Sequence, residues 1–505
     1  MSYITGSHAL KVGVYNQSWY YTVDQITNHD ISYTFNNRNP TSLTQVPPFR
    51  SELIANPDLG AYVNDQWTVR KLTLNLGLRF DWYSAHSAEF SLPANQYLSA
   101  RTFPRVDNIP NWKDLNPRVG VAYDLFGNGQ TAIKGALGRY VADDGNLNGG
   151  NTPSANAPIN SYINSVTRQW NDANRDYVPD CDLRALTANR ECGQVNNLNF
   201  GRAVATRTYD PNLLKGWGKR GYNWEGSIAL QHELRPGVGM NIAYYRRWFG
   251  NFTVADNVLI GAADFDPYCI TAPVDTRLPG GGGNQICGLY DIKPTSFSLN
   301  QTVIKLDPNR TEVFQGIDVA IRQRSSKGEI TAGLSTGQTV ADICNPVDSP
   351  QARFCHTTNP FSASTQLKLN AIYSLPWNTQ VSGTLQHLPG LSYTASYVAT
   401  NALIRPSLGR NLGACGVQAT CNGTATVELV EPFTQLEPRN TQIDVRLTRT
   451  FNLPHNARLH GRFDVYNLLN ASPVIGEVTR YGSVWRQPTA ILGARMFKFG
   501  FEFNF

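Results

Sequence analysis

The sequence is poor in charged residues and in methionine, and it lacks any long hydrophobic run. Charged residues make up 16% of the 505 residues, against about 25% in an average soluble protein, and only 3 residues are methionine. No window reaches about 18 consecutive apolar residues, and the mean hydropathy is −0.33. These shortages exclude a helical membrane protein and argue against a helical enzyme.

The sequence also has few features typical of an enzyme, a metal site or a nucleic-acid-binding protein. The excess of basic over acidic residues, 44 − 38 = +6, is too dilute over this length to predict nucleic-acid binding. The 8 histidines are scattered and form no pair at metal-ligand spacing. The run Gly280–Gly283 is not followed by the Lys-Ser/Thr of a phosphate-binding loop. We therefore expect no enzyme, no nucleic-acid partner, and no resident cofactor other than a calcium ion in one extracellular loop.

Aromatic residues (11%), glycine (42) and proline (29) are plentiful, and apolar residues alternate with polar ones. From Leu72 to Trp82 every second residue is large and apolar, and the residues between them are polar except for Gly77. Successive side chains of a strand point to opposite faces, so such a segment has one apolar and one polar face. The C-terminal strand repeats the pattern with Phe497, Phe499, Phe501, Phe503 and Phe505.

About fifteen strands of this kind can be counted, and the joints between them alternate in length. Short turns occur near Arg70-Lys71, Arg235-Pro236 and Pro376-Trp377, and long loops separate them. This alternation is typical of an all-β, up-and-down antiparallel transmembrane β-barrel, with short periplasmic turns and long extracellular loops. The expected strands are 7–22, 26–36, 57–69, 71–84, 116–125, 130–141, 220–234, 237–249, 312–324, 328–341, 363–375, 378–399, 441–452, 457–468 and 489–505. The expected loops are 85–115, 142–219, 250–311, 342–362, 400–440 and 469–488, of which 142–219 and 250–311 are the largest.

The strand count also predicts a direction. Counting back from Phe505 at the periplasmic end, the strand 7–22 would start on the extracellular side, whereas a complete barrel begins from the periplasm. Residues 1–12 show no secretory signal. We therefore expect residues 1–505 to be an N-terminally incomplete barrel domain.

The cysteines agree with an extracellular position of the long loops. All eight fall into pairs that are close in sequence, inside Pro-, Gly- or Asn-rich stretches of those loops, and none has a zinc-like C-x2-C spacing. Disulfides in these segments imply an oxidising compartment, although scattered free thiols are the alternative. The expected pairs are Cys181 with Cys192, Cys269 with Cys287, Cys344 with Cys355, and Cys415 with Cys421.

One loop segment is a candidate calcium site. Its acidic and amide side chains recur at positions 1, 3, 5 and 9 of a calcium-loop spacing, which lets their oxygens converge on a hard cation. The match is partial, because Tyr177 replaces the glycine of position 6 and Leu183 the glutamate of position 12. The alternative is an acidic, solvated loop. The candidate ligands are Asp172, Asn174, Asp176 and Asp180, with Asp182 as a further one.

Charged residues on the polar strand faces and aromatic residues near strand ends have two interpretations each. The charges could contact a plug or a passing ligand, but a wide barrel has a wet, polar interior in any case, and we favour this second interpretation. Trp248, Phe249 and Trp485 could bind ligand, but an interfacial aromatic girdle explains them better. The predicted inward charges are Arg79, Asp81, Arg118, Asp124, Asp318, Arg446, Arg462 and Asp464.

Taken in order, several segments resemble the C-terminal part of TonB-dependent outer-membrane receptors, and most of all the Oar-like group that carries a carboxypeptidase-regulatory-like domain. Each segment is a loose pattern by itself, but the order along nearly the whole chain is specific. The segments are 5–13, 59–67, 72–81, 116–127, 462–470 and 492–505.

The resemblance implies an outer-membrane barrel of about 22 strands in a Gram-negative-type bacterium, closed by an N-terminal plug and coupled to an inner-membrane TonB complex. It also implies uptake of an extracellular ligand whose identity is unknown. The chain departs from the family because the signal peptide, TonB box, plug and about seven strands are not found in it. A passive pore and a surface adhesin are the alternatives, and a plug segment upstream would discriminate against the pore.

Overall fold

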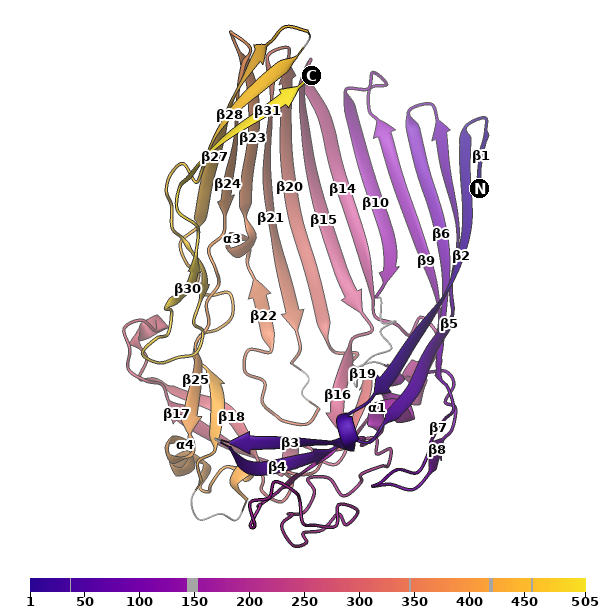
Figure 1. Cartoon of the computed structure of the whole chain (residues 1–505). Helices are drawn as coiled ribbons and strands as arrows, with labels where there is room; N and C mark the ends of the chain where they lie inside the picture. The colour runs from indigo at the N-terminus through magenta and orange to yellow at the C-terminus, as the bar shows by residue number, and fades with distance from the viewer. Residues whose placement is uncertain (37, 143–152, 345–346, 417–420, 456) are drawn as a thin grey trace.

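One curved antiparallel sheet, called the wall below, dominates the computed structural model (Figure 1). The structure describes all residues except 37, 143–152, 345–346, 417–420 and 456. The sheet has 17 strands, of which β13 (Lys215–Trp217) and β22 (His356–Asn359) are short additions, which leaves 17 − 2 = 15 that follow one another around the wall. They are β1 (Ser2–Thr5), β2 (His8–Gln25), β5 (Phe49–Val69), β6 (Leu72–Ser87), β9 (Asn111–Asp124), β10 (Thr131–Val141), β14 (Tyr222–Arg235), β15 (Val238–Gly250), β20 (Thr311–Ser325), β21 (Gly328–Asp342), β23 (Gln366–Leu375), β24 (Thr379–Leu388), β27 (Asn440–Asn452), β28 (Arg458–Tyr466) and β31 (Met496–Asn504).

Every wall strand pairs antiparallel with the next one, so the predicted up-and-down order is confirmed. Among the described residues, β1 pairs only with β2 and β31 only with β28. The wall is therefore open between β1 and β31. Both chain termini lie at the end of the wall that carries the short turns (Figure 1).

The two faces of the wall differ as the alternation predicts. Large apolar side chains such as Leu76, Val119 and Ile228 are 43%, 47% and 57% exposed, and they share one face. The opposite face carries polar and charged side chains. An apolar face that is not buried in protein needs an apolar solvent, which is the hydrocarbon of a membrane. No helix in the described part of the chain is long and apolar enough to cross a membrane.

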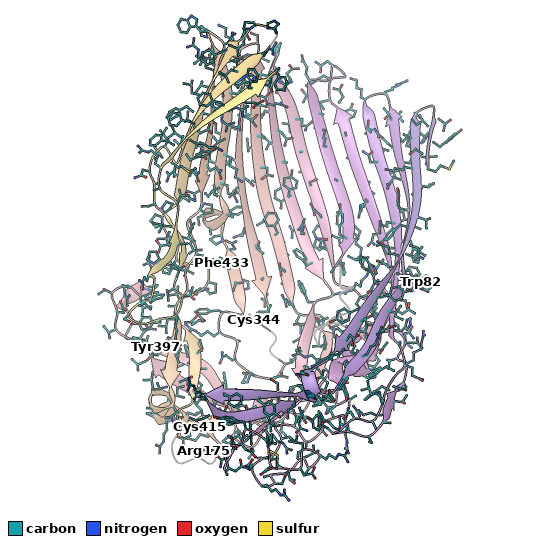
Figure 2. All side chains as sticks on the ribbon, viewed as in Figure 1. Trp82, Arg175, Cys344, Tyr397, Cys415 and Phe433 are labelled. Atoms are coloured by element: carbon teal, nitrogen blue, oxygen red, sulfur yellow. A yellow bond between two sulfur atoms is a disulfide. The ribbon has the colours of Figure 1, made fainter. Side chains whose placement is uncertain are left out.

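The long loops gather at the other end of the wall, where they form a folded loop cap (Figures 1 and 2). Most of the buried apolar residues lie there, in separate clusters around Phe49, Tyr268 and Tyr393. The wall cannot bury its apolar face against itself, so packing within the protein is concentrated in the cap. Its strands are β3 (Ile31–Asn36), β4 (Asn39–Gln45), β7 (Phe90–Leu92), β8 (Arg101–Phe103), β11 (Val166–Gln169), β12 (Arg207–Tyr209), β16 (Thr253–Asn257), β17 (Phe265–Thr271), β18 (Gln285–Ile292), β19 (Thr302–Leu306), β25 (Ser396–Thr400), β26 (Thr424–Glu428), β29 (Val474–Glu477) and β30 (Pro488–Ile491).

Helices are short and few in the described residues. The longest, α4 (Asn401–Leu408), packs on β17 inside the loop cap, and α3 (Phe361–Ser364) lies beside β21. The others are α1 (Pro158–Ser161), α2 (Pro211–Leu214) and the 3-10 turns η1 (Asn28–Asp30), η2 (Pro153–Asn156), η3 (Ala262–Asp264), η4 (Pro279–Gly281) and η5 (Gly413–Cys415).

Three of the expected wall strands are wrong in detail. Residues 26–36 do not enter the wall, because β3 pairs with β4, and β4 with β11, in a small sheet of the loop cap. The segment 378–399 divides into β24 of the wall and β25, which pairs with β26 in the cap. The segment 489–505 divides in the same way into β30 and β31.

These differences overturn the predicted direction of the first long strand. A tight turn joins β1 to β2, with Thr5 opposite His8, so β2 begins at the short-turn end. The predicted extracellular start of strand 7–22 is therefore wrong, because it depended on counting 26–36 as a wall strand. The alternation pattern of 26–36 is real, but it serves a loop hairpin.

Candidate ligand-binding wall and loop cap

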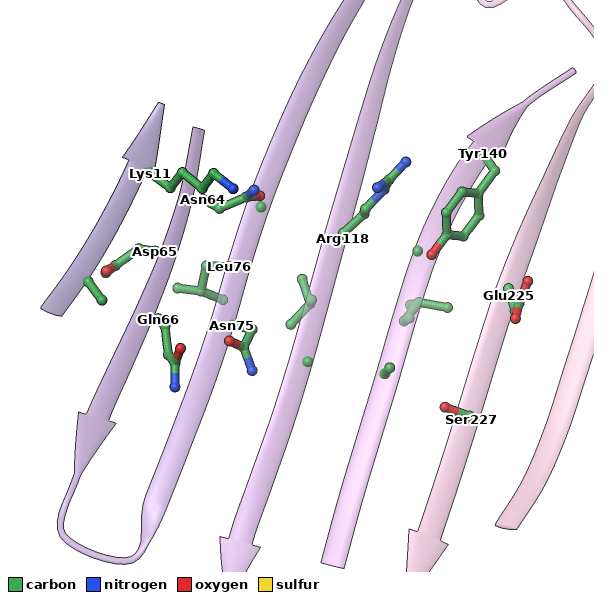
Figure 3. A pocket seen from close by; sticks show the side chains of 17 residues that line it. Lys11, Asn64, Asp65, Gln66, Asn75, Leu76, Arg118, Tyr140, Glu225 and Ser227 are labelled. Atoms are coloured by element: carbon green, nitrogen blue, oxygen red, sulfur yellow. The ribbon is translucent and has the colours of Figure 1, made fainter. Parts of the chain in front are cut away.

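The polar face of the wall lines a hollow that runs from β2 across β5, β6, β9 and β10 to β14 (Figure 3). Its volume is about 460 Å³. The lining includes Lys11, Asn64, Asn75, Arg118 and Tyr140, and the Cζ atom of Arg118 lies 4.6 Å from the centre of the Tyr140 ring. Amide, hydroxyl and cationic groups in this number can hydrogen-bond a polar ligand or a polar protein segment.

The strand register places all eight predicted inward charges on this polar face. Four of them form two ion pairs with one another, along a strand or across neighbouring strands. Arg79 donates to Asp81 at 2.8 Å, and Arg446 donates to Asp464 at 2.5 Å. Three of the others have different partners. Arg462 forms an ion pair with Glu502, and Asp318 accepts a hydrogen bond from the Ser335 hydroxyl. Asp124 accepts hydrogen bonds from the backbone N–H groups of Gly127 and Gly129.

A buried ion pair network at the loop end of β9 was not apparent from the sequence. The side chain of Asp114 is fully buried, and it accepts from Arg220 at 2.8 Å and from Arg139 at 3.3 Å. Arg139 also donates to Asn116 at 2.8 Å. The two arginines stand just before and just after the large 142–219 loop, so one carboxylate fixes both ends of that loop. Residues 143–152 of the loop lie outside the described residues.

The segment Gly333-Leu-Ser-Thr-Gly337 has the letters of a nucleophile elbow but not its structure. An elbow needs a sharp strand-to-helix turn that exposes the serine. Here the segment lies within the continuous strand β21, and the Ser335 hydroxyl donates to Asp318 at 2.6 Å. The segment is part of the polar wall and has no features of a catalytic serine.

The three aromatic residues expected in a membrane girdle have different environments. Trp248 is 36% exposed on the apolar face of the wall and stacks on Trp224, with ring centres 6.4 Å apart. Phe249 is the next residue along the strand and points to the other face. Trp485 is only 2% exposed, belongs to an apolar cluster of the loop cap, and donates to the carbonyl of Thr394. The girdle interpretation is therefore wrong for Trp485, because the 469–488 loop folds back into the cap, and for Phe249, because its side chain points away from the apolar face.

The eight cysteines all lie in the described part of the chain, and they form four disulfides that leave no free thiol there. Each bond joins two cysteines that are close in sequence. All four bonds lie in the long loops and none in a short turn, and Figure 2 labels Cys344 and Cys415 at the loop end of the molecule. The structure therefore contradicts the alternative of scattered free thiols. The bonds are Cys181–Cys192, Cys269–Cys287, Cys344–Cys355 and Cys415–Cys421.

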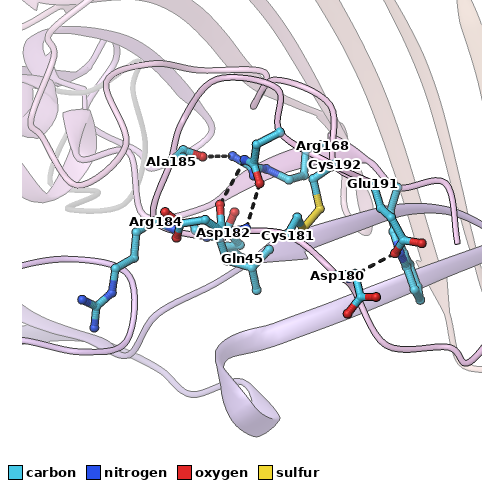
Figure 4. The surroundings of a disulfide bond; sticks show 12 residues. Gln45, Arg168, Asp180, Cys181, Asp182, Arg184, Ala185, Glu191 and Cys192 are labelled. Atoms are coloured by element: carbon cyan, nitrogen blue, oxygen red, sulfur yellow. Dashed lines mark hydrogen bonds between the residues drawn. A yellow bond between two sulfur atoms is a disulfide. The ribbon is translucent and has the colours of Figure 1, made fainter. Parts of the chain in front are cut away.

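Each disulfide closes its own local segment of the cap. The Cys181–Cys192 bond holds a turn against β4 and β11 (Figure 4), where Trp170 and Leu43 pack around it. The sequence separations are 6 to 18 residues, so the bonds limit the freedom of the cap without crossing between distant segments. Of the other three, the bond of Cys269 and Cys287 joins β17 to β18, that of Cys344 and Cys355 closes the connection from β21 to β22, and that of Cys415 and Cys421 lies between α4 and β26.

The candidate calcium segment forms an acidic turn on the surface of the cap. The amide of Asn174 donates to Asp176 at 3.0 Å and to Asp180 at 3.1 Å, and Asp172 accepts from the backbone N–H of Tyr177. Asp182 accepts from the backbone N–H of Arg184 and belongs to the neighbouring turn. Among the residues that the structure describes, no group of three or more His, Cys, Asp or Glu side chains could hold a metal ion. Calcium binding stays a prediction, and it would require the Asn174 amide to turn.

A second carboxyl cluster of the cap comes from residues far apart in the sequence. Arg486 forms an ion pair with Glu437, and its Nε lies 3.9 Å from Glu477. The side chain of Glu477 is 2% exposed. Burial raises the pKa of Glu477 and the neighbouring Glu437 raises it further, whereas Arg486 acts in the opposite direction. The cluster joins the segment before β27 to the β29–β30 hairpin.

Comparison with known proteins agrees with this architecture. A family model described as an outer membrane beta barrel domain matches residues 1–333. No curated protein matches the chain. Among solved structures, the outer membrane transporter YddB from Escherichia coli is 12% identical with a TM-score of 0.51, and the match covers 99% of this chain and 52% of that one.

Two further solved structures show the same general likeness. The FrpB iron transporter from Neisseria meningitidis is 10% identical, with a TM-score of 0.41 and coverage of 99% of this chain and 56% of that one. The receptor for ferripyoverdine in the outer membrane of Pseudomonas aeruginosa is 10% identical, with a TM-score of 0.43 and coverage of 98% and 48%. The chain thus spans about half the length of the solved structures that it resembles. At 12% identity, the likeness to YddB concerns the fold.

Proposed function

Because the chain belongs to the outer membrane beta-barrel domain family, and so lies in the outer membrane, we propose that it forms the barrel of a TonB-dependent receptor that takes up an extracellular ligand. The observation that carries the proposal is the polar hollow of the wall together with the folded loop cap at one end of that wall (Figure 1). Disulfides and apolar clusters keep the cap folded, as a binding surface requires, and the hollow beneath it offers a polar path inward.

The partners follow from the same proposal. In the complete protein, an N-terminal plug would fill the polar interior, and the plug would contact the TonB complex of the inner membrane. The open edges at β1 and β31 support the proposal that this wall is part of a larger barrel. Unpaired strand edges cannot be satisfied in lipid, and further strands would close the barrel. The Oar-like group and the C-terminal position of the chain within a longer receptor are part of the proposal.

Uptake by cells that produce the complete gene product tests the proposal. We expect energised cells to accumulate at least one of a set of radiolabelled probes, namely ferric chelates, cobalamin, a maltodextrin and an oligopeptide mixture. Accumulation should fall to background when TonB is deleted. Arg118→Ala removes a cation of the hollow and should lower uptake by about tenfold, the effect of losing one charged hydrogen bond.

Two controls separate the alternatives. Arg449→Ala alters an arginine on the outer face of the wall and should leave uptake unchanged. Accumulation that persists without TonB would identify a passive pore and contradict the proposal. Binding of cells to a surface without accumulation of any probe would indicate an adhesin.

A further inference from the structure

The outer, apolar face of the wall carries a cation at Arg246. In β15, Ile242, Tyr244, Arg246 and Trp248 alternate with inward residues and share the outer face. Arg246 is exposed, and in the described part of the chain no hydrogen bond or ion pair reaches its guanidinium. Its neighbour Arg247 points inward and pairs with Glu225 at 2.5 Å. Placing a charged side chain on a lipid-facing surface costs free energy unless the charge contacts a polar group. We therefore expect the guanidinium of Arg246 to bind a polar group from outside the protein.

The neighbours of Arg246 form a polar island within the apolar face. In β20 Gln315 stands opposite Arg246, and in β21 Gln338 stands opposite Gln315. Tyr244 donates to Gln315 at 3.4 Å, and Gln315 donates to Gln338 at 3.1 Å. These groups extend the polar surface sideways from the guanidinium over three adjacent strands.

The strand on the other side leaves room next to Arg246. Gly226 of β14 stands opposite it, and a Cβ atom there would meet its nearest neighbour, a methyl of Leu137, at an ordinary 3.7 Å. The stacked pair Trp224 and Trp248 closes this notch toward the loops. A cation in an open notch beside an indole pair can receive a headgroup from the side.

The depth of the island points to one kind of lipid. Trp224 and Trp248 lie near the loop end of β14 and β15, and aromatic residues in such positions mark the membrane–water interface. Below the island, Ile228, Ile242 and Ile317 continue the apolar face. The island therefore lies at the headgroup level of the outer leaflet, on the side of the extracellular loops.

We propose that this island binds the phosphorylated sugar headgroup of an outer-leaflet glycolipid. The planar guanidinium of Arg246 matches a phosphate with two parallel hydrogen bonds, and Gln315 and Gln338 present amide donors and acceptors to sugar hydroxyls. Trp224 and Trp248 flank the headgroup on the loop side of Arg246, and Ile228, Ile242 and Ile317 on the opposite side meet the acyl chains. The inference depends on the membrane position of the wall and not on ligand uptake, so it can fail while the uptake proposal holds.

Native mass spectrometry of the complete protein in detergent tests this site. The probes are bisphosphorylated lipid A, the same lipid without phosphates, and phosphatidylglycerol. We expect wild-type protein to retain lipid A, and Arg246→Gln to weaken that binding by about tenfold because a charge-assisted contact is lost. Arg449→Gln is the matched control, since Arg449 also faces outward but lies at the short-turn end, in the other leaflet. It should bind lipid A as the wild type does.

The other possible results of this experiment also support or overturn the proposed lipid site. Equal lipid A binding by Arg246→Gln and wild type would overturn the proposal, and so would wild-type binding of phosphatidylglycerol as tight as that of lipid A. If Arg246→Gln does not fold, the wild-type comparison decides by itself, because loss of the phosphates should abolish most of the binding. Arg246→Lys, which keeps the charge but not the planar fork, should bind with intermediate strength.

Discussion

Asp114 shows how single residues connect the wall to the loop cap. Its carboxylate is fully buried but lies between two guanidinium groups, from Arg139 and Arg220, which offset the cost of removing the charge from water. The contact is possible because β9 and β10 separate beyond the Arg118–Gly138 pair, and the short strand β13 joins β9 there. A residue of the wall thus defines where the largest loop begins and ends.

Glu477 gives a residue-scale prediction about pH. Its pKa is raised in the folded protein, so the folded state binds a proton more tightly than the unfolded state does, and its ionised form is disfavoured by burial. The cap around β29 and β30 should therefore become more stable as pH falls through the raised pKa toward the ordinary value, where the gain is complete. Protection of this hairpin in hydrogen exchange should rise about tenfold for each unit of pKa difference.

The control uses a carboxylate with the opposite shift. Backbone N–H groups of Asp180 and Ala173 lower the pKa of Glu191, so its contribution to stability is present near neutral pH and is lost on acidification. Glu477→Gln should abolish the acid-induced protection of the 474–491 hairpin, whereas Glu191→Gln should leave it intact. Hydrogen exchange of the wild-type hairpin is measured from about pH 8 down to about pH 4, near the ordinary carboxyl pKa, and corrected for intrinsic exchange rates. Protection that stays constant over this range would contradict the prediction.

At the scale of elements, the loop cap consists of small sheets that carry exposed turns. The sheet of β3, β4 and β11 buries Leu43 and Val166 on one face, and the Cys181–Cys192 turn packs against that face. The acidic turn 172–182 projects from this support. Its carboxylates are held by local hydrogen bonds, and the disulfide limits how far its far end can move.

The calcium prediction belongs to this element. If Asn174 turns its oxygen inward, calcium should bind the acidic turn with a dissociation constant of about 10⁻⁴–10⁻³ M, the range of extracellular modules. Isothermal titration of the complete protein measures this binding. Asp172→Asn combined with Asp180→Asn should remove the heat, whereas Asp107→Asn, in another loop, should not. No heat from wild-type protein at millimolar calcium would refute the site.

At the scale of the whole molecule, packing is divided between two regions. The wall depends on continuous hydrogen bonding between neighbouring strands and on lipid for its apolar face, whereas the cap depends on apolar clusters and disulfides. The two regions should therefore respond differently to reduction and to heat.

Gel mobility tests this division. The complete protein in dodecyl sulfate should migrate differently before and after boiling, because the closed hydrogen-bond network of a barrel resists detergent until it is heated. Since all four disulfides lie in the cap, a reductant should leave the mobility difference between unboiled and boiled samples in place. Identical mobility of the two samples without reductant would be incompatible with a barrel.

Much of the wall was predictable because alternation is local. Leu72 to Trp82 and Phe497 to Phe505 show their two faces from sequence alone, and the register confirms them. The same pattern misled at 26–36, since a cap hairpin alternates as a wall strand does. The cluster of Glu437, Glu477 and Arg486 had no sequence signal, because its members are far apart in the chain.

The amino-acid sequence by itself determined the two-faced strands, the alternation of short turns and long loops, and the pairing of cysteines that are close together. These features depend on neighbours within a few residues, through backbone geometry and turn chemistry. Only the tertiary structure decided which strands enter the wall, that Trp485 is buried, that Asp114 joins two arginines, and that Arg246 has Gln315 and Gly226 beside it. Such choices depend on contacts between distant segments, and local periodicity carries no information about the partner across a strand.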